Sequence, residues 1–134
     1  MTMMLRGVRG ATTVQQDTAD EILSATRELL QAMIETNGIK EAEVASVLFT
    51  TTPDLHAAYP AKAARDLGWR QAALLGFQEM DCVDAIPRCI RILIHWNTTR
   101  SLEEIRHVYM RDALVLRPDL YPDNKIVLNG RVSP

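Results

Sequence analysis

An arginine lies near the start of an otherwise apolar segment, CIRILIHW, at residues 89–96. Strand periodicity places Arg91, Leu93 and His95 on one face of this segment and its isoleucines on the other, which we expect to be core. The Arg91 face has two interpretations: a half-exposed sheet surface where the guanidinium reaches water, or an anion site where it pairs with a carboxylate. The strand alone favours the exposed surface, because most strand arginines are solvated.

Arg91 belongs to a wider set of charged and polar residues, each of which lies in or beside a segment that is predicted to be ordered. The other members are Arg9, Lys62, Arg65, Glu79, Tyr109 and Arg117. Cations from several elements, together with one carboxylate and one tyrosine, suit a small polyanionic molecule that carries a hydroxyl group. Taken alone, any one of these residues is more often a surface residue.

Chemistry based on a nucleophile, a metal or a cofactor has no signature in this sequence. There is no Gly-x-Ser-x-Gly motif and no glycine-rich phosphate loop. Cys82 and Cys89 do not have the spacing of zinc ligands, and the three histidines are scattered along the chain. We therefore predict no metal site and no cofactor, and we expect both thiols to be reduced and structural.

Length and composition indicate a single globular domain. The chain has 134 residues, of which 47% are hydrophobic and 24% charged, as in an ordinary soluble protein. A net charge of −2, a pI near 5.9 and dispersed basic residues argue against a nucleic-acid partner. Because there is neither an apolar run of about 18 residues nor a signal-peptide pattern, we expect a cytoplasmic protein that binds no membrane.

The N-terminal part of the chain predicts a strand followed by a long helix. Residues 5–14 alternate β-branched residues with glycines, as a strand with close backbone neighbours does. Residues 17–38 carry an apolar stripe at helical spacing. Thr18 and Glu21 form a capping-box pattern at the start of this helix, and Gly38 ends it.

The remaining predicted elements are shorter. They are strands at 44–52, 72–77 and 88–96, a short helix that begins near Pro60, another short helix with a capping pattern at Ser101 and Glu104, and a final strand at 113–120 that Pro118 stops. Residues after 120 show no strong periodicity.

The order of these elements predicts an α+β domain with a mixed β-sheet, one long helix and shorter helices. Helices that lie largely on one side leave the other face of the sheet uncovered. A second copy of the chain is the natural cover for that face, so we expect a homo-oligomer.

Five segments together resemble the monofunctional chorismate mutases of the AroH class. They are LRGVRGATTV, TPDLHAAYPAKAARDLGW, QEMDC, CIRILIHWNT and IRHVYMRDALVLRPDL, in consistent order from about residue 4 to residue 120. Such a set of spaced motifs is far more specific than a single motif. The resemblance implies a homotrimeric pseudo-α/β barrel with active sites between neighbouring subunits, a mutase domain at 1–120 and a tail at 121–134.

The resemblance also assigns catalytic roles. It places Arg91 beside the ether oxygen and a carboxylate of chorismate. Arg9 corresponds to the arginine that binds the enolpyruvyl carboxylate, and Tyr109 to the tyrosine that assists it. Glu79, within QEMD, corresponds to the carboxylate that faces the ring hydroxyl.

Further positions correspond to the walls of the cleft. Tyr59 and Arg65 match residues that are contributed across the subunit interface. The other wall positions are Lys62, Leu75, Gly76, Leu116 and Arg117. Lys62, Arg65 and Arg117 have a second interpretation as a solvated rim of little energetic importance.

One position departs from the family pattern. Where members have Cys or Ser, which can bind the glutamate, this chain has Gly76. We therefore expect Glu79 either to be less well oriented or to be held by a water or a backbone group.

The implied reaction is the Claisen rearrangement of chorismate to prephenate in phenylalanine and tyrosine biosynthesis, which needs no nucleophile, metal or proton transfer. Orientation of the enolpyruvyl side chain, and a fixed cation beside the breaking carbon–oxygen bond, would provide the catalysis. Two alternatives stay open at this point: a non-catalytic trimeric protein that binds carboxylate ligands, and an imine-deaminase-like enzyme of similar trimeric shape.

Overall fold

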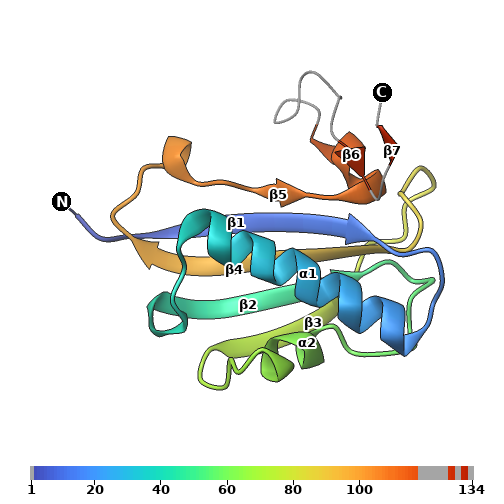
Figure 1. Cartoon of the computed structure of the whole chain (residues 1–134), viewed down its shortest axis with the longest axis horizontal. Helices are drawn as coiled ribbons and strands as arrows, with labels where there is room; N and C mark the ends of the chain where they lie inside the picture. The colour runs from blue at the N-terminus through green and yellow to red at the C-terminus, as the bar shows by residue number, and fades with distance from the viewer. Residues whose placement is uncertain (1, 118–126, 129–130, 133–134) are drawn as a thin grey trace.

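A computed structural model describes residues 2–117, 127–128 and 131–132. Its main feature is a five-stranded sheet in the order β3-β2-β4-β1-β5, with helices α1 and α2 on one face (Figure 1). The strands of this sheet are β1 (Met4–Thr13), β2 (Val44–Thr51), β3 (Ala73–Gln78), β4 (Cys89–Thr98) and β5 (Val108–Tyr109). The helices are α1 (Ala19–Asn37), α2 (Ala61–Asp66) and the 3-10 helices η1 (Glu41–Glu43), η2 (Leu102–Glu104) and η3 (Arg111–Leu116). Two short strands, β6 (Val127–Leu128) and β7 (Arg131–Val132), form a separate pair.

The directions of the strands make the sheet mixed. The central strand β4 is antiparallel to both β1 and β2, whereas the edge strands β3 and β5 run parallel to their neighbours. Parallel pairs need a connection that crosses the sheet, and α2 lies in the connection between β2 and β3. The predicted α+β domain, with a mixed sheet, one long helix and shorter helices, is confirmed.

The two ends of α1 follow from its terminal residues. Thr18 has extended backbone angles, and its hydroxyl accepts a hydrogen bond from the backbone N–H of Glu21 at 3.2 Å. Gly38 ends the helix in the left-handed conformation, with φ 72° and ψ 37°, and its N–H donates to the Ile34 carbonyl. The capping box is incomplete, because the Glu21 carboxylate accepts from the N–H groups of Gln15 and Gln16 instead.

The apolar stripe of α1 packs on the sheet and forms the core. Leu29, Leu30 and Met33 belong to one cluster with Val8 of β1, Val47 and Phe49 of β2, and Ile92, Ile94 and Trp96 of β4. Full burial of one such side chain contributes about 1.5–3 kcal/mol to folding. The isoleucines of β4 therefore lie on the covered face, as their alternation predicted.

The close approach of α1 to the sheet depends on a glycine. A Cβ atom at Gly10 would lie 2.5 Å from Met33 Sδ and 3.1 Å from Leu29 Cδ1, and both of these side chains are fully buried. Gly10→Ala should therefore lower the free energy of unfolding by about 1–3 kcal/mol, as measured by urea unfolding. Gly7→Ala in the same strand is the control, because its Cβ would meet only Leu93 at 3.4 Å. Equal stability of the two variants would contradict this account.

The predicted strand at 113–120 is wrong for residues 113–117, and its last three residues lie outside the described ones. Residues 111–116 form the 3-10 helix η3, and the strand in this part of the chain is the shorter β5, just before η3, which pairs with the free side of β1. Arg111 adopts a positive φ of 54°, which turns the chain out of the sheet after Tyr109. The predicted helix after Ser101 exists only as the three-residue η2, although its capping box with Glu104 is present. The predicted boundary between residues 120 and 121 lies outside the described residues.

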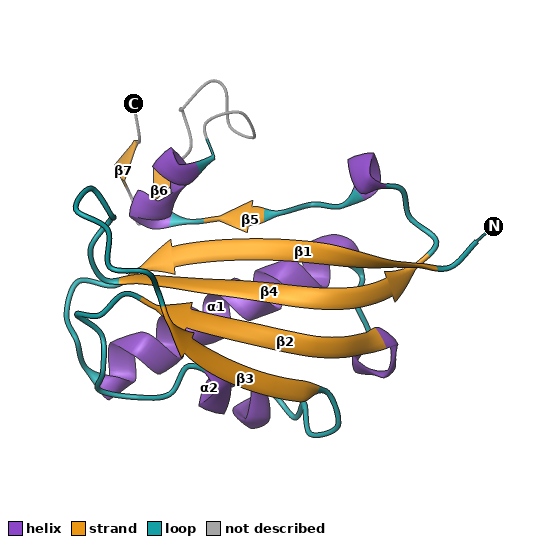
Figure 2. Cartoon of the chain, turned by 180° about the vertical axis from the view of Figure 1, so that it is seen from behind, coloured by secondary structure: helices purple, strands orange, loops and turns teal. Residues whose placement is uncertain are grey.

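The face of the sheet opposite α1 and α2 carries no helix among the described residues (Figure 2). We call it the open face. Its apolar side chains include Leu5 of β1 and Leu75 of β3, each 56% exposed, and Phe77 of β3, which is 47% exposed. Single exposed apolar residues are ordinary, but several on one sheet face indicate an interaction surface. Within the described residues, no helix has both the length and the apolar character that a membrane span requires.

Candidate active site

Four of the predicted site residues meet on the open face. Ala11 of β1 is in register with Arg91 of β4 on one side and with Tyr109 of β5 on the other. Arg9 lies two residues before Ala11 and therefore shares its face. Glu79 follows the end of β3 and lines, with Arg9, Arg91 and Tyr109, a cavity of about 150 Å³. Four strands thus bring together residues that are widely separated in the sequence.

Arg91 and Glu79 form an ion pair inside this cavity. The distance from Arg91 Nε to Glu79 Oε2 is 3.0 Å, and the two side chains are 48% and 20% exposed. Arg91 is therefore half exposed, as the solvated interpretation holds, and it also has a carboxylate partner, as the anion-site interpretation requires. Ion pairs this accessible to water contribute only about 0–1 kcal/mol to folding, so stability alone does not account for placing two charges here.

The Glu79 carboxylate has a second partner that the sequence did not reveal. The Thr50 hydroxyl donates a hydrogen bond to Glu79 Oε2 at 2.6 Å. Thr50 lies near the end of β2, directly opposite Arg91 in the pairing of β2 with β4. Only the register of the strands places this threonine in the site, because its sequence context, a run of three threonines, is typical of any strand end.

His107 is another site residue that sequence patterns missed. Its Nδ1 accepts a hydrogen bond from the backbone N–H of Arg9 at 3.0 Å. Burial lowers the pKa of His107 below its usual 6.5, and the positive charges of Arg9 and Arg117 lower it further. The imidazole is therefore neutral at neutral pH, which suits an acceptor nitrogen that positions the Arg9 backbone.

Protonation of His107 should destabilise the folded protein. Because the folded pKa is lower than the unfolded one, the unfolded chain binds the proton more readily between the two values. The stability that neutral His107 contributes to the folded state is complete above the usual pKa of 6.5. It is lost as the pH falls through that value towards the pKa of the folded state. His107→Gln, which offers an acceptor that does not titrate, should remove it. Urea midpoints of both proteins from about pH 8 to about pH 5 measure the effect, and parallel curves would contradict it.

Comparison with known proteins identifies the family to which this fold and site belong. The model of the family described as chorismate mutase type I matches residues 5–120. The chain belongs to the chorismate mutase type I family. The resemblance noted in the sequence is thereby confirmed.

Individual relatives of the family agree with this assignment. Chorismate mutase AroH from Bacillus subtilis (strain 168) is 48% identical over 119 residues, which cover 88% of this chain and 94% of the relative. Chorismate mutase AroH from Thermus thermophilus is 50% identical over 118 residues, covering 87% and 97%. The solved structure of a chorismate mutase from Clostridium thermocellum matches with a TM-score of 0.81 and 45% identity, over 82% of this chain and 98% of that one.

Three further predicted residues of the family cleft lie around the open-face cavity. Leu75 of β3 is in register with Leu48, which lines the cavity. Leu116 packs against a buried cluster that contains Tyr109. Arg117 is close enough to His107 for its charge to lower the pKa of the imidazole. Leu116 and Arg117 lie at the end of η3, beside β1 and β5, whereas Leu75 lies in β3 at the opposite edge of the sheet.

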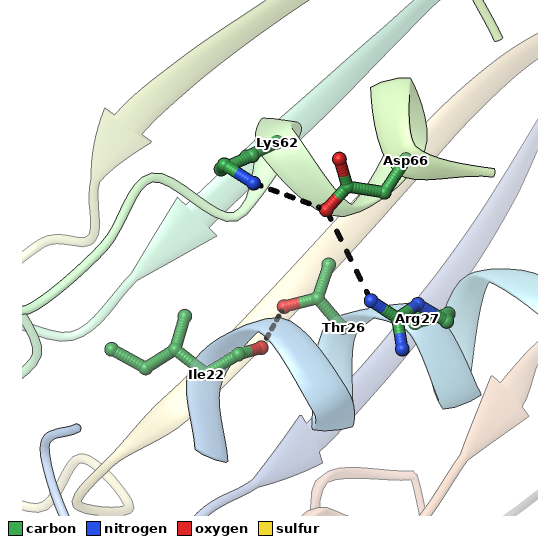
Figure 3. Close-up of polar contacts among 5 residues, drawn as sticks. All are labelled: Ile22, Thr26, Arg27, Lys62 and Asp66. Atoms are coloured by element: carbon green, nitrogen blue, oxygen red, sulfur yellow. Dashed lines mark hydrogen bonds and ion pairs between the residues drawn. The ribbon is translucent and has the colours of Figure 1, made fainter. Parts of the chain in front are cut away.

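The other predicted residues of the family cleft do not line this cavity. Tyr59 is 82% exposed and lines a separate cavity of about 460 Å³. Lys62 Nζ of α2 lies 3.3 Å from Asp66 Oδ2 of the same helix. The same oxygen lies 4.0 Å from Arg27 Nη2 of α1 (Figure 3). Arg65 is exposed on the same short helix. Lys62 and Arg65 lie on α2, which covers the opposite face of the sheet, so neither lines the open-face cavity of its own chain.

Gly76 also lies away from the Glu79 carboxylate. It is in register with Phe49, a core residue, and it lines the same 460 Å³ cavity as Tyr59. A Cβ atom at Gly76 would come no closer to another residue than 3.8 Å, at the Phe49 carbonyl oxygen. The side chains of Thr50 and Arg91 contact the carboxylate, a means of orienting Glu79 that the sequence analysis did not foresee.

The cysteine near the site is not a nucleophile. Cys89 is buried at the start of β4, and burial raises the pKa of its thiol to about 11. A thiol with that pKa is protonated at neutral pH and unreactive. Cys82 is exposed, and its thiol donates to the Asp84 carboxylate at 3.0 Å. Both cysteines are free thiols, and the predicted structural role is supported only for the buried Cys89.

Proposed function

We propose that the open-face cavity binds chorismate and converts it to prephenate, with Arg91, Glu79, Arg9 and Tyr109 as the catalytic residues. The observation that carries the proposal is the position of Arg91, a half-exposed cation held by a rigid central strand beside a carboxylate, in a chain of the chorismate mutase type I family. The reaction breaks the carbon–oxygen ether bond and forms a carbon–carbon bond within one molecule, so it requires no nucleophile.

The residues of the cavity have separable roles in this proposal. Arg9 and Tyr109 bind a carboxylate and hold the enolpyruvyl chain over the ring, which removes most of the entropy cost of reaching the reactive conformer. Arg91 stabilises the negative charge that grows on the ether oxygen as the bond breaks. Glu79 accepts a hydrogen bond from the ring hydroxyl and favours the partial positive charge on the ring.

We also propose that the working enzyme is a homotrimer whose sites are shared between subunits. A cavity of about 150 Å³ is smaller than the roughly 300–1,000 Å³ of typical ligand pockets, so one chain provides only part of a site. A neighbour that covers the open face would bury its apolar residues and would bring Tyr59, Lys62 and Arg65 to the cavity. In this proposal residues 1–120 form the catalytic domain, residues 121–134 form a tail, and the enzyme works in the cytoplasm.

An assay with chorismate tests the proposed reaction. Purified protein should remove the ultraviolet absorbance of chorismate and produce one equivalent of prephenate, without added metal or cofactor. Binding of chorismate without turnover would contradict the proposal and favour the non-catalytic alternative. The departure at Gly76 was the sequence feature that favoured that alternative, and the Thr50 contact supplies Glu79 with a side-chain donor in its place.

A further inference from the structure

The Glu79 carboxylate is held by two donors that both use the same oxygen. Thr50 Oγ1 lies 2.6 Å from Glu79 Oε2, and Arg91 Nε lies 3.0 Å from it. These are the contacts that the carboxylate makes within the described residues. Oε1 accepts no hydrogen bond from the described residues, so it is the oxygen left to accept one from a ligand hydroxyl in the cavity that Glu79 lines.

The register of the sheet makes Thr50 a fixed donor. Thr50 is paired with Arg91 of β4 on one side and with Phe77 of β3 on the other. It therefore lies between the strand that carries Arg91 and the strand that Glu79 follows. A threonine in a strand has few χ1 rotamers, and a hydrogen bond to a charged group is stronger than a neutral one. Both donors make charge-assisted hydrogen bonds to Oε2, but the short threonine side chain has fewer rotamers than the long arginine and therefore allows the carboxylate less freedom.

We propose that Thr50 is a positioning residue for Glu79. Its hydroxyl occupies Oε2, directs Oε1 to the hydroxyl of the substrate, and keeps the carboxylate from moving fully onto the Arg91 guanidinium. Without this donor Arg91 becomes the main partner of Glu79, and a closer carboxylate neutralises the cation that the breaking bond needs. The inference rests on the proposed function, because it concerns how Glu79 serves that reaction.

Thr50→Val tests the proposal, because valine keeps the shape and the strand preference of threonine but removes the donor. We expect turnover to fall about tenfold with a much smaller change in KM. Thr50→Ser restores the hydroxyl without the methyl group and should stay within about twofold of the parent. The control is Thr12→Val, the same change in β1, where the residue is buried and in register with Ile90 on the covered face and its hydroxyl has no hydrogen-bond partner among the described residues; it should leave turnover unchanged.

A double-mutant cycle separates positioning from general damage to the sheet. If Thr50 acts through Glu79, Thr50→Val should change turnover less than about twofold when Glu79 is already alanine. Parent-like turnover of Thr50→Val, failure of Thr50→Ser to restore it, or a full tenfold loss in the Glu79→Ala background would each overturn the inference. Parent-like turnover of Glu79→Ala itself would instead overturn the role of Glu79 in the proposed function.

Discussion

Replacement of Arg91 by methionine should reduce the turnover of chorismate by at least about 100-fold, or about 3 kcal/mol of activation free energy. Methionine keeps the volume of the arginine stem and removes the charge beside the breaking ether bond. Substrate affinity should change less than turnover, because the negative charge on the ether oxygen develops in the transition state. Initial rates over a range of chorismate concentrations provide both quantities.

Arg91→Lys distinguishes the position of the charge from its presence. Lysine keeps a positive charge but lacks the planar fork, and its ammonium group lies elsewhere. A misplaced charge does not replace a preorganised one, so this variant should also lose most turnover. Both variants should fold, because the Arg91–Glu79 pair is accessible to water and Glu79 keeps its hydrogen bond to Thr50. Arg70→Met, at an exposed position before β3, is the matched control. Parent-like turnover of Arg91→Met would contradict the catalytic role of Arg91 and would support its interpretation as a solvated strand residue.

If sites are shared between subunits, two variants that each have low turnover alone should regain turnover when their chains assemble together. Arg91→Met destroys the open-face cavity of its own chain but leaves Arg65 intact for a neighbour. Arg65→Met keeps the cavity of its own chain intact but removes the arginine that the chain contributes to a neighbour. An assembly of this variant alone should lose turnover by at least about tenfold, because the contact with the substrate carboxylate is lost. In mixed assemblies, some sites combine an intact cavity from one chain with an intact Arg65 from the next.

Random mixing gives a quantitative expectation. In an equal mixture, half of the cavities and half of the contributed arginines are intact, so about a quarter of the sites should be complete. Co-expression of the two variants should therefore give about a quarter of the parent rate, and sedimentation should show a trimer of the 15.1 kDa chain. A mixture of Arg91→Met with Arg9→Met is the control, because no cavity in it is intact. A rate that never exceeds the average of the two pure variants would contradict shared sites.

Much of the fold could be predicted because its signals are local. The helix α1 has its capping threonine, its apolar stripe and its terminal glycine within one continuous segment. The strand β4 alternates buried isoleucines with partly exposed residues. The segment that forms η3 has no such signal, because a short apolar run fits a strand and a helical turn equally well. Its conformation depends on the positive φ at Arg111, where the sequence has no glycine.

The site could be predicted only in part, for a related reason. Arg91 attracts attention as a charge in an apolar strand, but the strand alone favoured a solvated arginine, and the resemblance to the family assigned both Arg91 and Glu79 to the site. Thr50 and His107 are ordinary residues of their segments, and they become part of the site through contacts across 29 and 98 positions of the chain. Such contacts depend on strand register, which a single sequence specifies only indirectly.

The open face has a consequence for the newly made chain, before any assembly forms. An uncovered sheet face with exposed leucine and phenylalanine can associate with other unfolded or partly folded chains. Arg9 and the Arg91–Glu79 ion pair lie on that face, and charged groups there oppose the direct stacking of one such face on another. The side chains that we assign to the reaction thus also act as gatekeepers against aggregation, so selection for catalysis and selection for solubility favour the same two arginines.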